Sequence, residues 1–442
     1  MFVIVSISLL TAGPLAAQTA QDLAAMQKIN PRQRAPLAIE NGRLEAHNIR
    51  SEVSDHLWLM TDINGEEQVD DLNQVFDAAV PHWCEYFGID VRKAAKWRMR
   101  GMVIADRERF VDAGLFPDSL PEFPTGYQLG HEMWIYLQPG DYYTRHLLLH
   151  EGTHAFMQWF LDGVGAPWYS EGMAELLGLH SWQQGTLKMN FRLTARRQAA
   201  YWGRIKIIKQ ECRDGEFLEL EQVFDLPANA FRSVKGYAWS WAACEFLSTH
   251  PQSKKAFADL KRFANLPPGN FNAKFIRSLG ANRKSLARDW RLFVHEIDFG
   301  YDVAGCVVGN ASAATAAEEE AGQFEINTLR GWQKTSLKVQ SGERFAFQSD
   351  GRFVVGREDG EPWPCESNGI TIEYYRGQPL GSLMVGVLGA NNEIEHLLDA
   401  QPTSQVYKCP GEGTLCFRIN EFPGRLQDNE GTISVKVKRV EQ

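Results

Sequence analysis

The sequence lacks several features that would assign its class at once. It has no long basic run, and its net charge of −9 argues against nucleic acid as a partner. Beyond the first residues, no stretch approaches 18 uninterrupted apolar residues, so we expect no stable membrane span in the mature chain. No internal repeat is present. Hydrophobic residues make up 44% and charged residues 23% of the 442 positions, which excludes a disordered polymer, a collagen and a coiled coil.

Cysteine is scarce, and its spacing forms no metal-binding pattern. The seven cysteines include no CxxC pair, so metal ligation by thiolates is not indicated. They are expected to be buried free thiols or to form a few disulfides. Spacing favours one pair, Cys409 with Cys416, across the short PGEGTL loop. The odd count leaves at least one thiol unpaired.

Shifts in composition predict the organisation of the chain. Residues 1–17, MFVIVSISLLTAGPLAA, are uncharged, apolar and end in small residues, which is typical of a secretory signal peptide and predicts a secreted or periplasmic protein. The usual Lys or Arg before the apolar run is missing, so an unusual membrane anchor is the alternative. A polar lead-in over residues 18–53 precedes a first domain over 54–300. Residues 301–321 are predicted as a linker because they contain many small and acidic residues, and a second domain covers 322–442.

The two predicted domains differ in their hydrophobic patterns. In the first, the runs HLWLMTD, RMRGMVIAD and EMWIYLQP predict strands, and helical periodicity dominates from residue 141 to 298. In the second, β-branched and aromatic runs recur between clusters of Gly, Asp and Asn, which predicts about seven or eight strands. The expected layout is therefore an α+β domain followed by an all-β jelly roll or sandwich.

The strongest chemical signal is HEGTH, residues 150–154. On a helix, positions i and i+4 project from one face, so His150 and His154 can bind one metal ion. Glu151 is placed to reach a water on that ion and not the ion itself. A lone histidine is more often structural, so the significance of the motif depends on a third ligand.

That third ligand is expected from PWYSEGMAELLG, residues 167–178. A catalytic zinc takes three protein ligands and keeps one position for water. Glu171 lies in an apolar helical run behind a Gly/Pro turn, and Glu175 follows one turn later on the same face. Glu171 is predicted to bind zinc, and Glu175 to accept the free ring N–H of a liganding histidine. The reverse assignment, and two carboxylates that simply flank a solvated helix, remain open.

HEGTH followed by WYSEGMAE resembles the gluzincin zinc metallopeptidases, and within them the bacterial peptidase-MA-like (DUF1570-type) group. The resemblance covers roughly residues 54–250. It implies a zincin-like fold with a mixed sheet, an HExxH helix and a helical lower lobe, in which EMWIYLQP is the edge strand that borders the cleft. It also implies that a zinc-activated water, deprotonated by Glu151, hydrolyses a peptide, protein or glycoprotein.

The same resemblance draws attention to GYAWSWAACEFL, residues 236–247, because gluzincin-like enzymes often carry a tyrosine on a later helix. Tyr237 is the candidate donor to the oxyanion, and a packed aromatic residue at a helix start is the alternative. His146, four residues before His150, is a weaker candidate for a polar group near the cleft. His131 and His180 are expected to be structural.

The C-terminal part of the chain contains the runs AGQFEINTLRGWQKTSLKVQSGERFAFQSDGRFVVG, PLGSLMVGVLG and FRINEFPGRLQDNEGTISVKV. Together they resemble the PA-I galactophilic lectin domain. The resemblance implies a β-sandwich in which a loop of N-D-x-P-G-x-x-x-N-N-x-G type binds calcium, and the calcium binds sugar hydroxyls. The matching loop is NEFPGRLQDNEG, residues 420–431. Glu421, Asp428, Asn429 and the backbone carbonyl of Arg425 fall on ligand positions. The loop departs from the pattern at Glu421 and Asp428, and the sugar-contacting loop is not recognisable. A calcium site and an Asx-rich loop without an ion are both open.

Three functions are compatible with these patterns. The first is a secreted zinc metallopeptidase whose accessory β-domain binds calcium and carbohydrate. The second is a lectin-like binding protein with an inactive peptidase-like domain, and the third is a non-peptidase zinc hydrolase. The presence of both histidines, Glu151 and Glu171 favours an active enzyme over an inactive copy.

Overall fold

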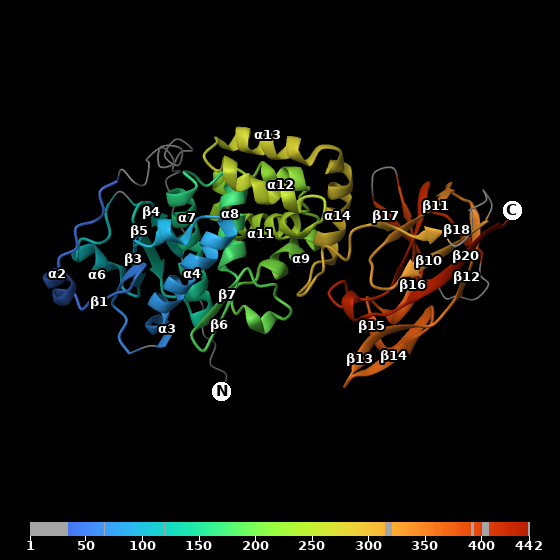
Figure 1. Ribbon diagram of the computed structural model, residues 1–442, viewed down its shortest axis with the longest axis horizontal. Helices are drawn as coiled ribbons and strands as arrows, with labels where there is room; N and C mark the ends of the chain where they lie inside the picture. The colour runs from blue at the N-terminus through green and yellow to red at the C-terminus, as the bar shows by residue number, and fades with distance from the viewer. Residues whose placement is uncertain are drawn as a thin grey trace, which may run out of the picture.

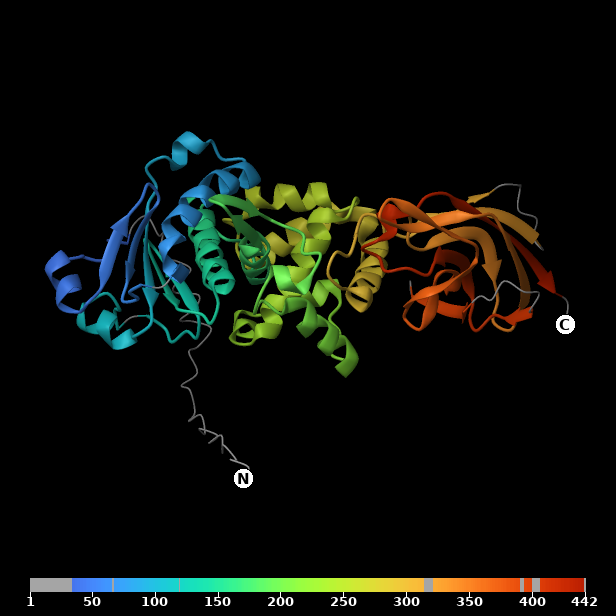
Figure 2. The ribbon, with the colours of Figure 1, turned by 90° about the horizontal axis from the view of Figure 1, so that it is seen from below.

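The computed structural model describes residues 34–65, 67–118, 120–313, 321–389, 393–399 and 406–440. The predicted leader lies outside these residues. Three units follow one another along the molecule: a sheet with flanking helices, a helical lobe, and a β unit (Figures 1 and 2). The predicted layout, mixed α and β followed by β, is confirmed at this level. Within the described ranges, no helix combines the length and the apolar character needed to cross a membrane.

The first unit is a five-stranded sheet in the order β1-β2-β3-β5-β4. Its strands are β1 (Arg50–Val53), β2 (Leu57–Thr61), β3 (Met99–Ile104), β4 (Gly126–Leu129) and β5 (Glu132–Tyr136). The middle strands β2, β3 and β5 run parallel, whereas β1 and β4 are antiparallel to their neighbours. The three runs predicted as strands are confirmed as β2, β3 and β5.

Two features of this sheet differ from the sequence-based expectations. The run EMWIYLQP forms β5, which lies between β3 and β4, so the expectation that it is the edge strand is wrong. The edge is β4, whose half-buried residues do not show a clear alternation. At the other edge, β1 pairs with β2 and lies inside the stretch expected as a lead-in, because buried Leu44 and Ile49 pack this segment onto the sheet.

Helices cover both faces of the sheet because its strands alternate in burial direction. In β3, Met99 and Val103 join the large hydrophobic core, whereas Met102 and Ile104 join a smaller cluster on the opposite face. The large core includes α4 (Leu72–Phe87) and α7 (Asp141–Phe160), and the smaller cluster includes α2 (Asn41–Ala46) and α6 (Arg107–Asp112). Figure 1 shows α4 and α7 between the sheet and the helical lobe.

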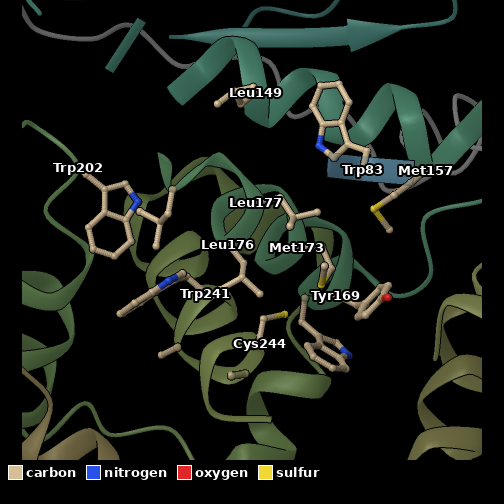
Figure 3. Packing of buried hydrophobic residues seen from close by; sticks show 14 of the residues in the cluster. Trp83, Leu149, Met157, Tyr169, Met173, Leu176, Leu177, Trp202, Trp241 and Cys244 are labelled. Carbon is tan, nitrogen blue, oxygen red and sulfur yellow. The ribbon is translucent and has the colours of Figure 1, made fainter. Parts of the chain in front are cut away.

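The helical lobe is built around α8 and α11, which pack closely together (Figure 3). A Cβ at Gly172 of α8 would lie 2.4 Å from the Ser240 carbonyl oxygen of α11, so the glycine of SEGMAE permits this approach. The hairpin of β6 (His180–Gln183) and β7 (Thr186–Met189) follows α8. The helices of the lobe are α8 (Pro167–Gly178), α9 (Arg204–Asp214), α10 (Leu220–Phe224), α11 (Val234–Thr249), α12 (Lys254–Asp259), α13 (Pro268–Leu279) and α14 (Arg283–Glu296).

The β unit contains two larger sheets that enclose a separate hydrophobic core, as in a β-sandwich. One sheet has the order β18-β12-β20-β10-β9 and the other β15-β16-β19-β11-β8, with β17 paired to β16 and a β13-β14 hairpin beside them. The prediction of a β unit is confirmed, but its described residues form thirteen strands where about seven or eight were expected, because several, such as β8 and β9, are only two residues long. The strands are β8 (Gly309–Asn310), β9 (Ser312–Ala313), β10 (Ala321–Asn327), β11 (Gln333–Val339), β12 (Arg344–Asp350), β13 (Phe353–Glu358), β14 (Glu361–Cys365), β15 (Asn368–Tyr375), β16 (Gln378–Leu388), β17 (Ile394–Asp399), β18 (Val406–Lys408), β19 (Gly413–Ile419) and β20 (Thr432–Val440).

The stretch expected as a linker is packed where it is described. Tyr301, Val303 and Cys306 are buried in the core of the helical lobe, and β8 and β9 pair with strands of the β unit. A buried ion pair also joins the two units: Nη1 of Arg418 in β19 lies 2.9 Å from Oε2 of Glu296 in α14. The helical lobe and the β unit therefore share a specific interface.

All seven cysteines lie within the described residues, and all are free thiols. The predicted pairing of Cys409 with Cys416 is therefore wrong. Cys409 packs in the core of the β-sandwich, whereas Cys416 packs in a separate cluster with Val308 and Trp332. The two side chains are thus buried in different hydrophobic clusters, although they are close in sequence.

Candidate metal centre

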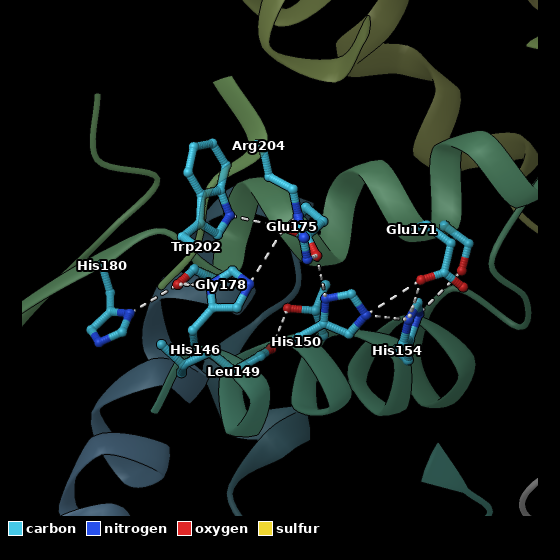
Figure 4. A network of polar contacts seen from close by, with 12 residues as sticks. His146, Leu149, His150, His154, Glu171, Glu175, Gly178, His180, Trp202 and Arg204 are labelled. Atoms are coloured by element: carbon cyan, nitrogen blue, oxygen red, sulfur yellow. Dashed lines mark hydrogen bonds and ion pairs between the residues drawn. The ribbon is translucent and has the colours of Figure 1, made fainter. Parts of the chain in front are cut away.

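Two helices bring the predicted metal-binding residues together. The helix α7 carries His150 and His154, and α8 carries Glu171 (Figure 4). Glu151 follows His150 on α7. A turn at Gly165, with a positive φ of 75°, precedes α8, and Pro167 occupies its first turn, where the missing N–H costs no hydrogen bond. This short connection places α8 against α7, so residues 16 to 21 positions apart can meet.

The three predicted ligands form a nearly equilateral triangle of donor atoms. The Nε2 atoms of His150 and His154 are 3.2 Å apart, and Oε2 of Glu171 lies 3.3 Å from each. Ligands about 2.0 to 2.2 Å from a tetrahedral ion are separated by roughly 3.3 to 3.6 Å. The donor set therefore fits a tetrahedral ion with one further position toward solvent, where the Glu171 side chain is 22% exposed.

A polar group lies behind each histidine ring, and the one behind His154 is within hydrogen-bond distance. Oγ of Ser170 lies 3.1 Å from Nδ1 of His154, and Oε1 of Glu175 lies 3.6 Å from Nδ1 of His150. With the proton on Nδ1 in both rings, each Nε2 presents its lone pair to the centre, as metal-binding histidines require. Glu175 lies behind His150, but Nδ1 of His150 has no hydrogen-bond partner among the described residues, so the predicted hydrogen bond to Glu175 is not formed. Ser170 was not expected from the sequence.

Glu175 is fixed by two residues that the sequence did not indicate. Nε and Nη2 of Arg204 donate to its two carboxylate oxygens at 3.0 and 2.7 Å, and Nε1 of Trp202 donates at 2.9 Å (Figure 4). A fully buried carboxylate requires such partners. From the sequence one can infer only that a buried Glu175 carboxylate needs hydrogen-bond partners. The pattern does not indicate which residues supply them.

A second group, His146, His150 and Glu175, is also close enough to hold an ion. Its carboxylate, however, already accepts three hydrogen bonds from Arg204 and Trp202, and Nδ1 of His146 lies 3.0 Å from the Gly178 carbonyl oxygen. His146 is fully buried, and its Nε2 lies 3.4 Å from Glu175. The donor set on His150, His154 and Glu171 is therefore the better metal site.

The candidate site carries an excess of negative charge. Burial alone would lower the pKa of His150, but the carboxylates of Glu171, Glu151 and Glu175 raise it to about 9. Burial opposes the ionised form of Glu171, yet His154 and His150 lower its pKa to about 2. These shifts show that the carboxylates favour a positive charge between the two rings, which a divalent cation would supply.

Glu151 reaches from α7 to the edge strand of the sheet. Its side chain is buried, and burial raises the pKa of its carboxyl group. A Cβ at Gly126, the first residue of β4, would lie 2.7 Å from its Oε1. The backbone of β4 therefore passes directly over Glu151, and only glycine leaves room for both. The other edge of β4 pairs with no described strand.

Tyr237 lies on the first turn of α11, close to the candidate ligands. Its ring centroid is 6.0 Å from that of His150, and the Arg204 guanidinium lies 5.6 Å from its face. Burial and the neighbouring Glu171 raise the pKa of its phenol, so the group remains protonated and able to donate. The remaining predicted histidines lie outside the site: His131 contacts Trp159, and buried His180 stacks on Tyr142.

The loop predicted to bind calcium follows β19. Glu421 and Asn429 are both 1% exposed, and Oε2 of Glu421 and Oδ1 of Asn429 have no hydrogen-bond partner among the described residues. Burial raises the pKa of Glu421 to about 7. The Arg425 carbonyl accepts the Asp428 N–H at 3.1 Å, while its guanidinium pairs with Glu373. Two buried oxygens without partners are compatible with a cation in this loop.

Comparison with known protein families finds no match, and no curated protein matches the chain either. Among solved structures, a chain described as "EclA N-terminal domain; PllA-like lectin" is 20% identical; the match covers 27% of this chain and 95% of that chain, with a TM-score of 0.20. This score is too low to assign a fold. The description of the β unit therefore depends on its own strands.

Proposed function

We propose that the N-terminal half of this protein is a zinc-dependent metallopeptidase of the gluzincin type, with a zincin-like arrangement of sheet and helices. The observation that carries the proposal is the triangle of donor atoms on His150, His154 and Glu171. Ser170 lies within hydrogen-bond distance of Nδ1 of His154, the Glu175 carboxylate lies 3.6 Å from Nδ1 of His150, and Glu151 directly follows His150 on α7. A purely structural pair of histidines would not require this arrangement.

A bound zinc would act as a Lewis acid and would lower the pKa of a water molecule bound to it. Glu151 takes the proton of the attacking water and later delivers it to the leaving amine. Burial raises the pKa of this carboxyl group, which brings it closer to the value that proton transfer near neutral pH requires. The phenol of Tyr237 is the donor to the developing oxyanion, because it stays protonated and lies beside His150.

The substrate would bind along the edge strand β4, next to these groups. An extended peptide can add to an unpaired sheet edge through main-chain hydrogen bonds. Because Gly126 of β4 touches Glu151, a peptide on this edge would pass close to the general base. This arrangement favours peptide bonds as the substrate over other groups that zinc enzymes hydrolyse.

The proposal is tested with the purified full chain. It should contain about one zinc per chain, and it should cleave an unfolded protein substrate. The variant His154→Ala should lose the metal, whereas Glu151→Gln should retain the metal and lose hydrolysis; Glu85→Gln, at an exposed position, is the control. Hydrolysis by Glu151→Gln would contradict the role of Glu151. Zinc without turnover would favour a binding protein, and turnover confined to other bonds would favour a different hydrolase.

We further propose that the C-terminal β-sandwich is an accessory domain that binds calcium and, through it, carbohydrate of a glycoprotein substrate. Support comes from the two buried oxygens without partners on Glu421 and Asn429, at positions where the PA-I-like loop has ligands. The leader predicted from residues 1–17 is compatible with a secreted or periplasmic location.

A further inference from the structure

The charge of the helical lobe is distributed very unevenly. Residues 252–284 contain eight Lys and Arg and one Asp, a net charge of +7, although the whole chain has −9. The remainder of the chain therefore carries −16. We call these eight cations the basic face: Lys254, Lys255, Lys261, Arg262, Lys274, Arg277, Arg283 and Lys284.

The basic face lies on α12, α13 and the residues between and after them, which form one side of the helical lobe in Figure 1. Lys274 of α13 reaches back across this surface, with Nζ 4.8 Å from the ring of Phe263. The apolar residues Phe271, Phe275 and Leu279 of α13 are buried, so its polar side faces outward. All members of the face are exposed except Lys261, which is half-buried.

Most of these cations are not neutralised within the described chain. Arg262 pairs with Asp259, and Arg283 with Glu221, but the other six form no ion pair with a described residue. Unpaired like charges on one face repel one another and lower stability. Their concentration on an otherwise acidic protein therefore points to an anionic partner and not to a contribution to folding.

A cavity of about 290 Å³ opens beside the basic face. Lys254, Lys261 and Arg192 line it, and Nζ of Lys261 is held by the Tyr86 carbonyl oxygen at 3.0 Å. Glu245 is the one carboxyl group in the lining, and burial raises its pKa to about 7, so it is only partly ionised near neutral pH. The cavity is of a size for one small anionic group, such as a phosphate.

We propose that the basic face docks the protein on the surface of an anionic phospholipid bilayer, with one headgroup phosphate in the cavity between Lys254 and Lys261. Clusters of four to eight Lys and Arg on one surface bind anionic headgroups through charge. No large hydrophobic residue among residues 252–284 is exposed, so the surface offers no ring on which a nucleic acid base could stack and no group that would insert into lipid. This inference is independent of the proposed peptidase activity.

The test is co-sedimentation of the full chain with vesicles of phosphatidylglycerol and phosphatidylcholine, compared with vesicles of phosphatidylcholine alone. The chain should bind only the anionic vesicles, and 0.5 M NaCl should release it. The triple variant Lys254→Gln, Lys255→Gln, Arg277→Gln should bind about 100-fold more weakly. The control variant Lys206→Gln, Lys436→Gln, Lys438→Gln removes three exposed cations elsewhere and should bind as the unmodified chain does.

A single variant, Lys261→Gln, tests the cavity separately and should weaken binding about fivefold or more. Binding unchanged in this variant would overturn the placement of a headgroup in the cavity. Absence of binding to anionic vesicles, or equal losses in the triple and control variants, would overturn the docking surface. Retention on a soluble polyanion such as heparin without vesicle binding would assign the basic face to a polymer and also overturn the proposal.

Discussion

The hydroxyl of Ser170 lies 3.1 Å from Nδ1 of His154, although the two residues are 16 positions apart and belong to different helices. Ser170 directly precedes Glu171, so consecutive residues of α8 supply a candidate ligand and the group that orients another ligand. Within WYSEG, Ser170 and Glu171 therefore each lie against a histidine of the candidate site.

Replacing Ser170 by alanine should weaken zinc binding by about tenfold or more, because the ring of His154 loses the partner that fixes its tautomer and orientation. Competition with a chromophoric chelator measures the affinity. Ser240→Ala is the matched control, since its buried hydroxyl has no hydrogen-bond partner in the described part of the chain. Equal affinities in both variants would remove Ser170 from the site.

Replacing Gly126 by alanine should reduce hydrolysis by about 100-fold while zinc remains bound. A Cβ there would lie 2.7 Å from Oε1 of Glu151 and would displace the proposed general base. Turnover and metal content are measured on the same preparation. Gly42→Ala, where an added methyl group meets nothing within 4 Å, is the control. Normal turnover in Gly126→Ala would show that Glu151 need not lie against β4.

Replacing Tyr237 by phenylalanine should lower kcat by roughly 100-fold with little effect on KM, because the phenol is proposed to donate only as the oxyanion develops. Steady-state kinetics on a peptide substrate separates the two constants. Tyr86→Phe removes another buried phenol, which contacts Met173, and should leave kcat unchanged. An unaltered kcat in Tyr237→Phe would identify the residue as a packing aromatic.

The free energy of unfolding should decrease as the pH rises from about 4.5 to about 7, because of Glu245. Burial raises the pKa of this carboxyl group from 4.5 to about 7. Below pH 4.5 the group is protonated in both the folded and unfolded states; above that value only the unfolded state releases its proton, which favours unfolding until pH 7. The cost reaches roughly 3 kcal/mol at most. Urea unfolding of Glu245→Gln should lack this contribution, and a parallel pH dependence in both proteins would refute it.

Calcium should raise the melting temperature of the full chain if the loop of residues 420–431 binds it, since a ligand stabilises the state to which it binds. Glu421→Gln should abolish the shift because it removes a buried carboxylate oxygen. Glu430→Gln, in the same loop, is the control, because the exposed Glu430 forms a surface ion pair with Arg357. If calcium does not change the melting temperature, the loop does not bind calcium.

The sequence allowed the local parts of the candidate site to be predicted. His150 and His154 followed from helical spacing, and Glu171 and Glu175 from a second helix close by in the chain. Arg204 and Trp202 could not be predicted, because their contacts with Glu175 depend on how α8 packs against residues nearly 30 positions away. Ser170 could have been suspected, since a serine beside a ligand often has a hydrogen-bonding role.

In the fold, too, features that follow from local sequence patterns were predictable, whereas features that depend on distant packing were not. Strands with strong apolar alternation, such as β12 and β20, are recognisable in the sequence, because burial of one face produces the pattern. β4 was missed because its half-buried residues give little contrast. The edge position of EMWIYLQP was taken from the family resemblance alone. β14 was missed because its two prolines argue against a strand, and prolines are tolerated there only because β14 pairs with β13 alone.

The ion pair between Arg418 and Glu296 has a consequence for the reach of the molecule. Its side chains are 7% and 6% exposed, and breaking a pair so enclosed costs several kcal/mol. This ion pair therefore opposes free rotation of the β-sandwich relative to the helical lobe. If the β-sandwich binds a ligand as proposed, this ion pair would help to keep the bound ligand at a constant distance from the candidate metal site beside His150.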